Sequence, residues 1–144
     1  RLIPLDYGSI TTSPESTTPA RIKRIYDELG LLMERFSPSV MAVEKLFFNR
    51  NVTTAFSVGQ ARGVLLLAAE QRGVPVVEYT PLQVKQAVVG YGQAEKRQVQ
   101  EMVKLLLGLG ERPKPDDVAD AMAVAICHAH SSQIFQRLQK GWPL

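Results

Sequence analysis

An acidic residue lies within an apolar stretch that is typical of a buried strand. The stretch VMAVEKLFF spans residues 40–48, and Glu44 stands at or near the end of the strand expected over 40–46. A buried carboxylate is costly unless it has a partner, and the carboxyl ends of strands in open α/β sheets form the edge where ligands bind. Glu44 therefore either belongs to a binding site, or lies exposed just past the strand and pairs with Lys45.

Two further acidic residues share one face at the start of a predicted helix. Asp117 and Asp120 are three residues apart, a spacing that places side chains on the same helical face. Helix capping and the helix dipole explain Asp116 or Asp117, but not Asp120, which lies one turn further in. The small side chains of ADAMAVA, 119–125, would let this helix approach a sheet closely and bring Asp120 toward a strand end. The alternative is one capping residue and one exposed aspartate.

These three carboxylates would repel one another in a half-buried cleft. The usual partner of such a set is a hard divalent cation with oxygen ligands, Mg²⁺ or Mn²⁺. Two ions about 4 Å apart can stabilise the attacking and leaving oxygens of a phosphodiester. We therefore predict a two-ion site made by Glu44, Asp117 and Asp120. His128 follows Asp120 by eight residues on roughly the same face, and we expect it to be packed rather than catalytic.

Basic and aromatic residues surround these acids in the sequence. Aromatic side chains can act as wedges between the bases of a distorted duplex, although packing of one Phe in the core is the alternative. Lysines and backbone amides around GYG, 90–92, could contact phosphate. A net charge of +3 and a pI of about 9.2 permit a nucleic-acid partner without requiring one. The predicted DNA contacts are Phe47, Phe48, Arg50, Gln60, Arg62, Lys85, Lys96 and Arg97.

Apolar periodicity predicts the elements that must position these residues. Thr18 followed by Pro19 is a cap signal for a helix. The alternation of strands and helices predicts an α/β fold with parallel pairing, in a single domain of 144 residues. Three strands are few for this many helices, so we expect further strands ahead of Arg1. The expected strands are 1–12, 40–46 and 74–79, and the expected helices are 19–36, 52–72, 81–89, 94–108 and a last one from about 116 that leads into a C-terminal tail, 131–144.

Composition excludes several classes of protein. Cys127 is the only cysteine, which rules out an internal disulfide and a CxxC zinc site and favours a reducing cytoplasm. No apolar run approaches the roughly 18 residues that span a bilayer, and no signal peptide precedes the first polar residues. We therefore expect a soluble cytoplasmic protein.

Three ordered segments resemble the RuvC family of Holliday junction resolvases. The resemblance implies an RNase H-like α/β fold, with a mixed sheet flanked by helices. It implies a Mg²⁺-dependent endonuclease that nicks two like-polarity strands of a four-way DNA junction in recombination and repair, leaving 5′-phosphate and 3′-hydroxyl ends. It also implies a homodimer that pairs through the helix holding GQARG, and the partners RuvA and RuvB. The segments are AVEKLFFNRNVTTAFSVGQARG, YTPLQVKQAVVGYGQAEKRQVQEMV and DDVADAMAVAICHAH, within a likeness from about Leu5 to His130.

The resemblance also implies roles for individual residues. Glu44, Asp117 and Asp120 match the metal-binding acids of the family. Lys85 and Lys96 match lysines that contact phosphate close to the scissile bond, and they would stabilise charge developing on the phosphoryl oxygens. The Phe47 position is similar to that of a Phe that contacts DNA near the crossover.

One part of the family pattern is missing from this sequence. RuvC-like chains open with a strand that carries an Asp in a GIDPG-like motif, and a second strand follows before the segment that matches LDYGSITT, 5–12. Asp6 is not expected to replace that Asp, so three of four expected acids are visible. A chain that begins at Arg1 is expected to lack the first two strands, bind metal weakly and cleave poorly. The alternatives are a non-catalytic junction-binding module, another RNase H-like nuclease that acts on RNA, and a purely structural role.

Overall fold

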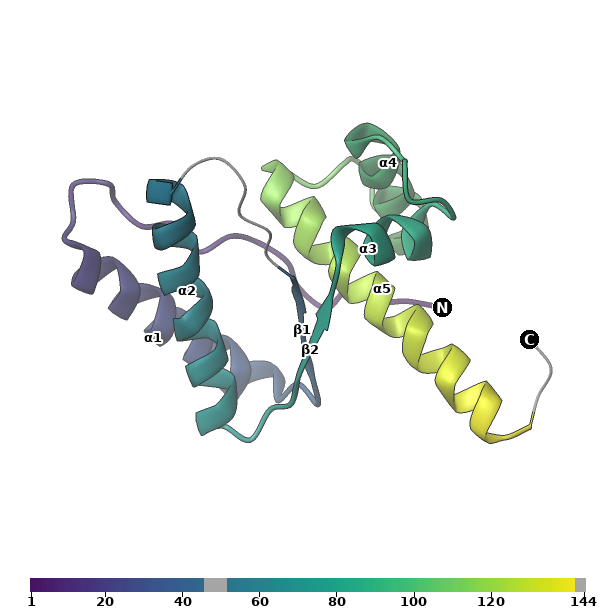
Figure 1. Ribbon diagram of the computed structural model, residues 1–144, viewed down its shortest axis with the longest axis horizontal. Coiled ribbons are helices and arrows are strands. Elements are labelled where there is room, and N and C mark those ends of the chain that lie inside the picture. The colour runs from purple at the N-terminus through teal and green to yellow at the C-terminus, as the bar shows by residue number, and fades with distance from the viewer. Residues whose placement is uncertain (46–51, 142–144) are drawn as a thin grey trace. The chain divides into compact units, whose positions relative to one another are not determined.

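The computed structural model describes residues 1–45 and 52–141 and contains the predicted mixture of helices and strands (Figure 1). The chain divides into two compact units, which we name by their helices. The α1–α2 unit comprises residues 10–41 and 46–77, and the α3–α5 unit comprises residues 1–9, 42–45 and 78–144. No helix in the described part of the chain is long and apolar enough to cross a membrane. The elements are α1 (Thr18–Phe36), β1 (Met41–Glu44), α2 (Val52–Gln71), β2 (Val76–Tyr79), α3 (Pro81–Val88), α4 (Lys96–Leu107) and α5 (Asp116–Gln139).

Strands β1 and β2 form a parallel pair. The Met41 amide donates to the Pro75 carbonyl at 2.8 Å, and the Lys45 amide donates to the Tyr79 carbonyl at 2.7 Å. The sequence offset between donor and acceptor is the same at both ends, which identifies a parallel register and confirms the predicted pairing. The carboxyl ends of both strands therefore lie at one edge, where Glu44 is the last residue of β1.

The strand predicted over 1–12 is wrong, because residues 1–13 adopt no regular secondary structure. The apolar alternation there suits a strand, but a strand also needs a hydrogen-bonded neighbour. Among the described residues, the only sheet is the pair β1–β2, which is smaller than the expected mixed sheet. Within this segment, Leu2 packs against the core of the α3–α5 unit, whereas Ile3 and Leu5 are exposed.

Helices α1 and α2 lie side by side around a small core of their own (Figure 1). Met33 of α1 is buried there together with Ala68, Ala69 and Val74. Leu32 and Met33 are both apolar, but only Met33 is buried, whereas Leu32 is exposed. The two candidates are adjacent, and the sequence period alone does not decide which of them the packed face includes.

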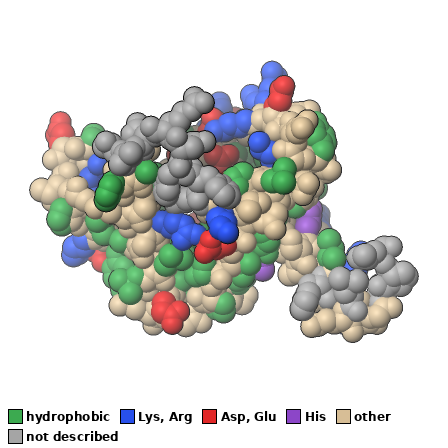
Figure 2. Space-filling view, viewed as in Figure 1, with side chains coloured by type: hydrophobic (Ala, Val, Ile, Leu, Met, Phe, Trp, Pro, Cys, Tyr) green, Lys and Arg blue, Asp and Glu red, His purple; other side chains and the backbone are tan. Residues whose placement is uncertain are grey.

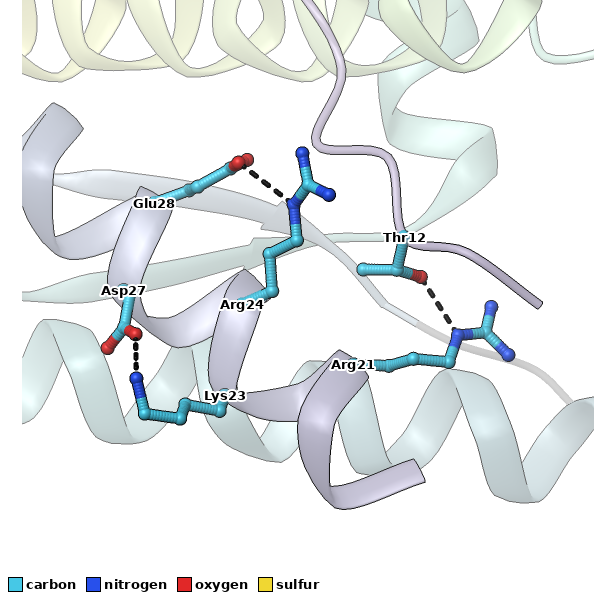
Figure 3. Close-up of polar contacts among 6 residues, drawn as sticks. All are labelled: Thr12, Arg21, Lys23, Arg24, Asp27 and Glu28. Carbon is cyan, nitrogen blue, oxygen red and sulfur yellow. Dashed lines mark hydrogen bonds and ion pairs between the residues drawn. The ribbon is translucent and has the colours of Figure 1, made fainter. Parts of the chain in front are cut away.

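The outer face of α1 carries polar contacts within its own unit (Figure 3). Arg24 Nε donates to Glu28 Oε1 at 3.1 Å, and Lys23 pairs with Asp27 in the same i,i+4 arrangement. Arg21 Nε donates to Thr12 Oγ1 at 2.9 Å. These exposed pairs each stabilise a helix by only a few tenths of a kcal/mol, so they indicate a solvated face rather than a binding site.

The cap of α1 lies one residue earlier than the sequence suggests. Thr17 Oγ1 accepts a hydrogen bond from the Ala20 amide, so Thr17 rather than Thr18 is the N-cap. We expect Thr17→Ala to lower the free energy of unfolding by about 1 kcal/mol, because a helix amide loses its partner, and Thr18→Ala to have a much smaller effect. Urea unfolding of both variants, followed by circular dichroism, measures the difference. Equal losses in the two variants would contradict this assignment.

A second hydrophobic core forms around α5 in the α3–α5 unit. Its largest fully buried side chains are Ile126, Val103 and Cys127. Val103 and Val99 come from α4. Burial raises the pKa of the Cys127 thiol, which keeps it protonated and inert. Helix α5 continues to Gln139 and therefore includes most of the predicted tail.

Candidate active site

A cleft of about 270 Å³ in the α3–α5 unit collects acidic and basic side chains from four elements. Glu44 comes from the end of β1, Lys85 from α3, Lys96 from the first residue of α4 and Asp120 from α5. The remaining lining is apolar and consists of Pro81, Val84, Val99 and Ala123. The cleft therefore brings together two of the three predicted metal-binding acids and both of the predicted catalytic lysines.

The small side chains of α5 allow Asp120 to reach this cleft. Ala119 and Ala123 are fully buried on either side of it, so the helix backbone approaches its neighbours closely. Asp120 itself is half-buried. The sequence-based expectation that ADAMAVA brings Asp120 toward a strand end agrees with this arrangement.

The two lysines stand on helices whose starts are strongly specified by sequence. Helix α3 begins with a capping box, in which Thr80 Oγ1 accepts from the Gln83 amide at 3.1 Å and Gln83 Oε1 accepts from the Thr80 amide at 2.8 Å. Helix α4 begins after Glu95, whose amide donates to Gln98 Oε1 at 2.8 Å. Such reciprocal bonds satisfy amides that a helix start leaves without partners.

The loop between the lysines is held against both helices. Gln98 Nε2 donates to the Tyr91 hydroxyl at 2.6 Å, which ties the loop to α4. A Cβ at position 92 would overlap the Leu82 side chain of α3, so Gly92 permits a close approach. Gly90 has φ +104°, a conformation that glycine adopts readily and other residues avoid. The loop is therefore part of the framework that sets the positions of Lys85 and Lys96.

The electrostatics of the cleft oppose ionisation of its carboxyl groups. Burial raises the pKa of Glu44, the charge of Asp120 raises it further, and the charges of Lys85 and Lys96 partly offset both effects. Burial also raises the pKa of Asp120, and Lys96 lowers it. Half-buried carboxyl groups whose ionisation is disfavoured are typical of sites that bind a cation or handle protons.

The raised pKa of Glu44, caused mainly by burial, predicts a pH-dependent cost to stability. Because the folded-state pKa of Glu44 is raised, the folded chain holds this proton at a pH where the unfolded chain has released it, and stability falls as pH rises through that window. We expect Glu44→Gln, which stays neutral, to raise the free energy of unfolding in EDTA at pH 7 by less than about 1 kcal/mol, since water screens a half-exposed carboxylate. Urea unfolding at pH 7 and below the ordinary pKa of glutamate measures it. The gain in the free energy of unfolding should vanish at the lower pH. The control variant Glu78→Gln, which replaces an exposed carboxyl group on β2, should show no gain.

Lys96 contacts two acidic residues of α5. Its Nζ lies 3.4 Å from Asp116 Oδ2 and 3.8 Å from Asp120 Oδ2. The charge of Asp120 and the hydrogen bond with Asp116 raise the pKa of Lys96, so the ammonium form is favoured. Asp117 is exposed and does not line the cleft.

Sequence reasoning missed one polar residue next to this site. Gln100 is 8% exposed on α4, and its Nε2 donates to Asp116 Oδ1 at 3.0 Å. The available signal was a polar residue beside Val99 on an otherwise apolar face. Asp116 was interpreted only as a possible capping residue, whereas it contacts side chains from α4.

His128 has a partner away from the acids. Its Nδ1 lies 2.7 Å from the Tyr79 hydroxyl at the end of β2, and both groups are half-buried. This contact is what a packed, hydrogen-bonded histidine makes. It agrees with the expectation that His128 is packed.

The remaining predicted DNA contacts are distributed over several elements. Arg97 is exposed on α4, while on α2 Gln60 is exposed and Arg62 is half-buried. Basic and acidic side chains are interspersed on the face shown in Figure 2, in keeping with the mild net charge of +3. Three further predicted contacts lie outside the described residues: Phe47, Phe48 and Arg50.

Glu44 and Asp120 have the chemistry of a hard-cation site. In the ranges 1–45 and 52–141, no group of three or more His, Cys, Asp or Glu side chains is placed so that it could hold a metal ion. Mg²⁺, however, commonly takes only one or two protein carboxylates and completes its shell with water and substrate phosphate. The half-buried acid pair fits that requirement, because a cation would stabilise the ionised forms that burial disfavours.

Comparison with known proteins places this cleft in a family. The family model described as "Crossover junction endodeoxyribonuclease RuvC" matches residues 1–128. A protein of that name from Brevibacillus brevis is 64% identical over 129 residues, covering 90% of this chain and 78% of the relative. Another from Desulfitobacterium hafniense is 59% identical over 138 residues, covering 96% of this chain and 84% of the relative.

Solved structures agree with the sequence matches. Thermus thermophilus RuvC in complex with a Holliday junction substrate superposes with a TM-score of 0.83 at 43% identity, covering 87% of this chain and 76% of that chain. A further T. thermophilus RuvC structure gives a TM-score of 0.80. The predicted RNase H-like α/β fold is thereby confirmed. The chain belongs to the RuvC family of crossover junction endodeoxyribonucleases.

Proposed function

We propose that this chain resolves four-way DNA junctions by metal-dependent hydrolysis of two phosphodiester bonds, in recombination and repair. The observation that carries the proposal is the cleft in which Glu44 and Asp120 face the same space as Lys85 and Lys96. Phosphodiester hydrolysis needs both kinds of group, because acids hold cations and lysines neutralise the phosphate. Each nick would leave a 5′-phosphate and a 3′-hydroxyl.

The carboxylates would hold the metal. We propose Glu44 and Asp120 as the principal ligands and Asp117, one turn before Asp120, as an additional one. Mg²⁺ is the proposed ion, Mn²⁺ the alternative, and two ions per site are expected for this class of reaction. When bound, the cations would polarise the phosphoryl oxygens and activate the attacking water.

The lysines would bind and orient the scissile phosphate. Lys85 and Lys96 reach the cleft from separate helices, so they can contact a phosphate from two directions. Their ammonium groups would stabilise negative charge as it develops on the phosphoryl oxygens. Arg97, Gln60 and Arg62 are proposed to contact the DNA backbone elsewhere.

A symmetric junction calls for a symmetric enzyme. Two nicks in strands of like polarity need two sites related by a two-fold axis, so we propose a homodimer. The T. thermophilus relative whose structure contains a Holliday junction substrate supports the choice of DNA. RuvA and RuvB, which the family resemblance implies, are the proposed partners, and the cytoplasm is the proposed compartment. Because the family model spans residues from both compact units, we propose that they belong to one nuclease domain.

A comparison of substrates tests this function. The chain is incubated with a four-way junction, a linear duplex of the same arms and an RNA–DNA hybrid, with Mg²⁺ for cleavage and with EDTA for gel-shift binding. We expect selective binding of the junction and paired, ligatable nicks at symmetric positions. Binding without nicking would favour a junction-binding role, and preferential cleavage of the hybrid would favour a different RNase H-like activity. Equal affinity for junction and duplex would contradict the proposal.

A further inference from the structure

A chain of contacts links a buried residue to the rim of the cleft. Gln100 Nε2 donates to one oxygen of Asp116 at 3.0 Å, and the other Asp116 oxygen lies 3.4 Å from Lys96 Nζ. Lys96 Nζ lies 3.8 Å from Asp120 Oδ2, which faces the cleft. Both oxygens of Asp116 are therefore engaged by groups on α4, although Asp116 itself begins α5.

We infer that Asp116, anchored by Gln100, is a positioning residue that holds the Lys96 ammonium at the rim of the cleft. The inference rests on the proposed function only for the use of Lys96 toward phosphate. The contact between Asp116 and Lys96 does not depend on that function. Asp116 is not itself among the residues that line the cleft, so it would act on the substrate only through Lys96.

The physical need for such an anchor follows from the lysine side chain. Lysine is a flexible chain with a compact charge, and it has about 2 kcal/mol of rotamer entropy to lose when it is fixed. An aspartate that could itself rotate would fix it poorly. Gln100 is buried and must satisfy its amide, so its hydrogen bond sets the orientation of Asp116 and aims the second oxygen at Lys96.

The arrangement also leaves capacity for substrate and metal. An ammonium group has three donors, and Asp116 and Asp120 face at most two of them. Lys96 Nζ lies nearer to Asp116 Oδ2 than to Asp120 Oδ2, so Asp116 is its principal partner. A role of Asp116 limited to the helix dipole would not require contact with α4, and this difference makes the two explanations separable.

The first test measures how firmly Lys96 is held, without reference to activity. The metal-free chain is acylated with an amine-reactive ester, and the rate at Lys96 is compared with that at Lys104 of the same helix by peptide mass spectrometry. We expect Asp116→Asn and Gln100→Met to raise the Lys96 rate about two- to fivefold, the range that an exposed ion pair allows. Gln100→Met changes no charge, so it isolates positioning. Unchanged Lys96 rates in both variants would overturn the inference.

A matched control removes an equal charge elsewhere. Glu101 is also on α4, but it pairs with Arg112 at 3.3 Å. Glu101→Gln should leave the Lys96 rate unchanged. A rise equal to that of Asp116→Asn would mean that net charge, not the specific contact, protects Lys96, and it would contradict the proposal.

A double-mutant cycle then links the contact to DNA. Affinity for the four-way junction in EDTA is measured for Asp116→Asn, Lys96→Met and the double variant. We expect Asp116→Asn to weaken binding when Lys96 is present and to have no further effect when it is absent. A structural role of Asp116 would instead weaken both backgrounds equally, and simple repulsion of DNA would make Asp116→Asn bind more tightly in both. If Lys96→Met binds like the parent chain, the proposed phosphate role of Lys96 fails while its positioning by Asp116 stands.

Discussion

Replacing Glu44 by Gln, or Asp120 by Asn, is expected to lower the rate of junction nicking on the order of 100- to 1,000-fold. Each change removes a negative charge from the half-buried pair that would hold the metal, while the shape of the side chain is kept. Because the fold does not depend on those charges, junction affinity in EDTA should be unchanged or slightly tighter. Single-turnover nicking in Mg²⁺ and gel shift in EDTA measure the two quantities.

The matched control for this prediction is Glu78→Gln. Glu78 is an exposed acid on β2, the strand that pairs with β1, and it does not line the cleft. This variant should nick at the parental rate. If the cleft variants kept parental rates too, Glu44 and Asp120 would not be the metal-binding residues and the proposed site would be wrong.

The largest loss of stability is expected from Ile126→Ala. Ile126 is 2% exposed in the core around α5, and truncation of a fully buried isoleucine costs about 2–5 kcal/mol. An apolar cavity that Ile126 lines together with Leu107 and Met122 already adjoins this position. Neighbouring side chains can therefore relax into part of the new space, so we expect a value in the lower half of that range. Urea unfolding with circular dichroism measures the loss.

Helix α5 supplies its own control for that experiment. Ile134 has the same side chain on the same helix but is 48% exposed. Ile134→Ala should change the free energy of unfolding by less than about 0.5 kcal/mol. Ala has a higher helix propensity than Ile, so propensity would favour both variants, and similar losses at both positions would contradict the assignment of Ile126 to the core.

The local elements were predictable because their signals are local. The Thr–Pro pair typical of a helix start recurs at Thr80 and Pro81, where α3 begins, and the apolar spacing of α4 includes its buried Val99 and Val103. Glu44 in β1 was recognisable because a carboxylate within an apolar strand is costly unless it has a partner. These features depend on neighbouring residues, which a sequence displays directly.

Other features depend on contacts between distant residues. The choice between Leu32 and Met33 for the buried face of α1 depends on how α2 packs. The strand expected over 1–12 had the right pattern, but a strand forms only beside a partner. The link from Gln100 to Asp116 joins two helices, and no spacing rule connects those positions. Asp117 shares a helix face with Asp120 but does not line the cleft. Helical spacing does not determine how much of that face the neighbouring elements cover.

The hydrogen bond from Gln98 to the Tyr91 hydroxyl has a consequence for the thermodynamics of DNA recognition. A loop that is immobilised while the polypeptide folds has already lost its conformational freedom when a nucleic acid arrives. On the proposed function, the lysines on either side of it would meet a phosphate at a preset separation, and association would need no ordering step in that region. Selectivity at this position would then come from rigidity. A nucleic acid whose phosphates do not match the fixed spacing of the two lysines would gain little from their charges.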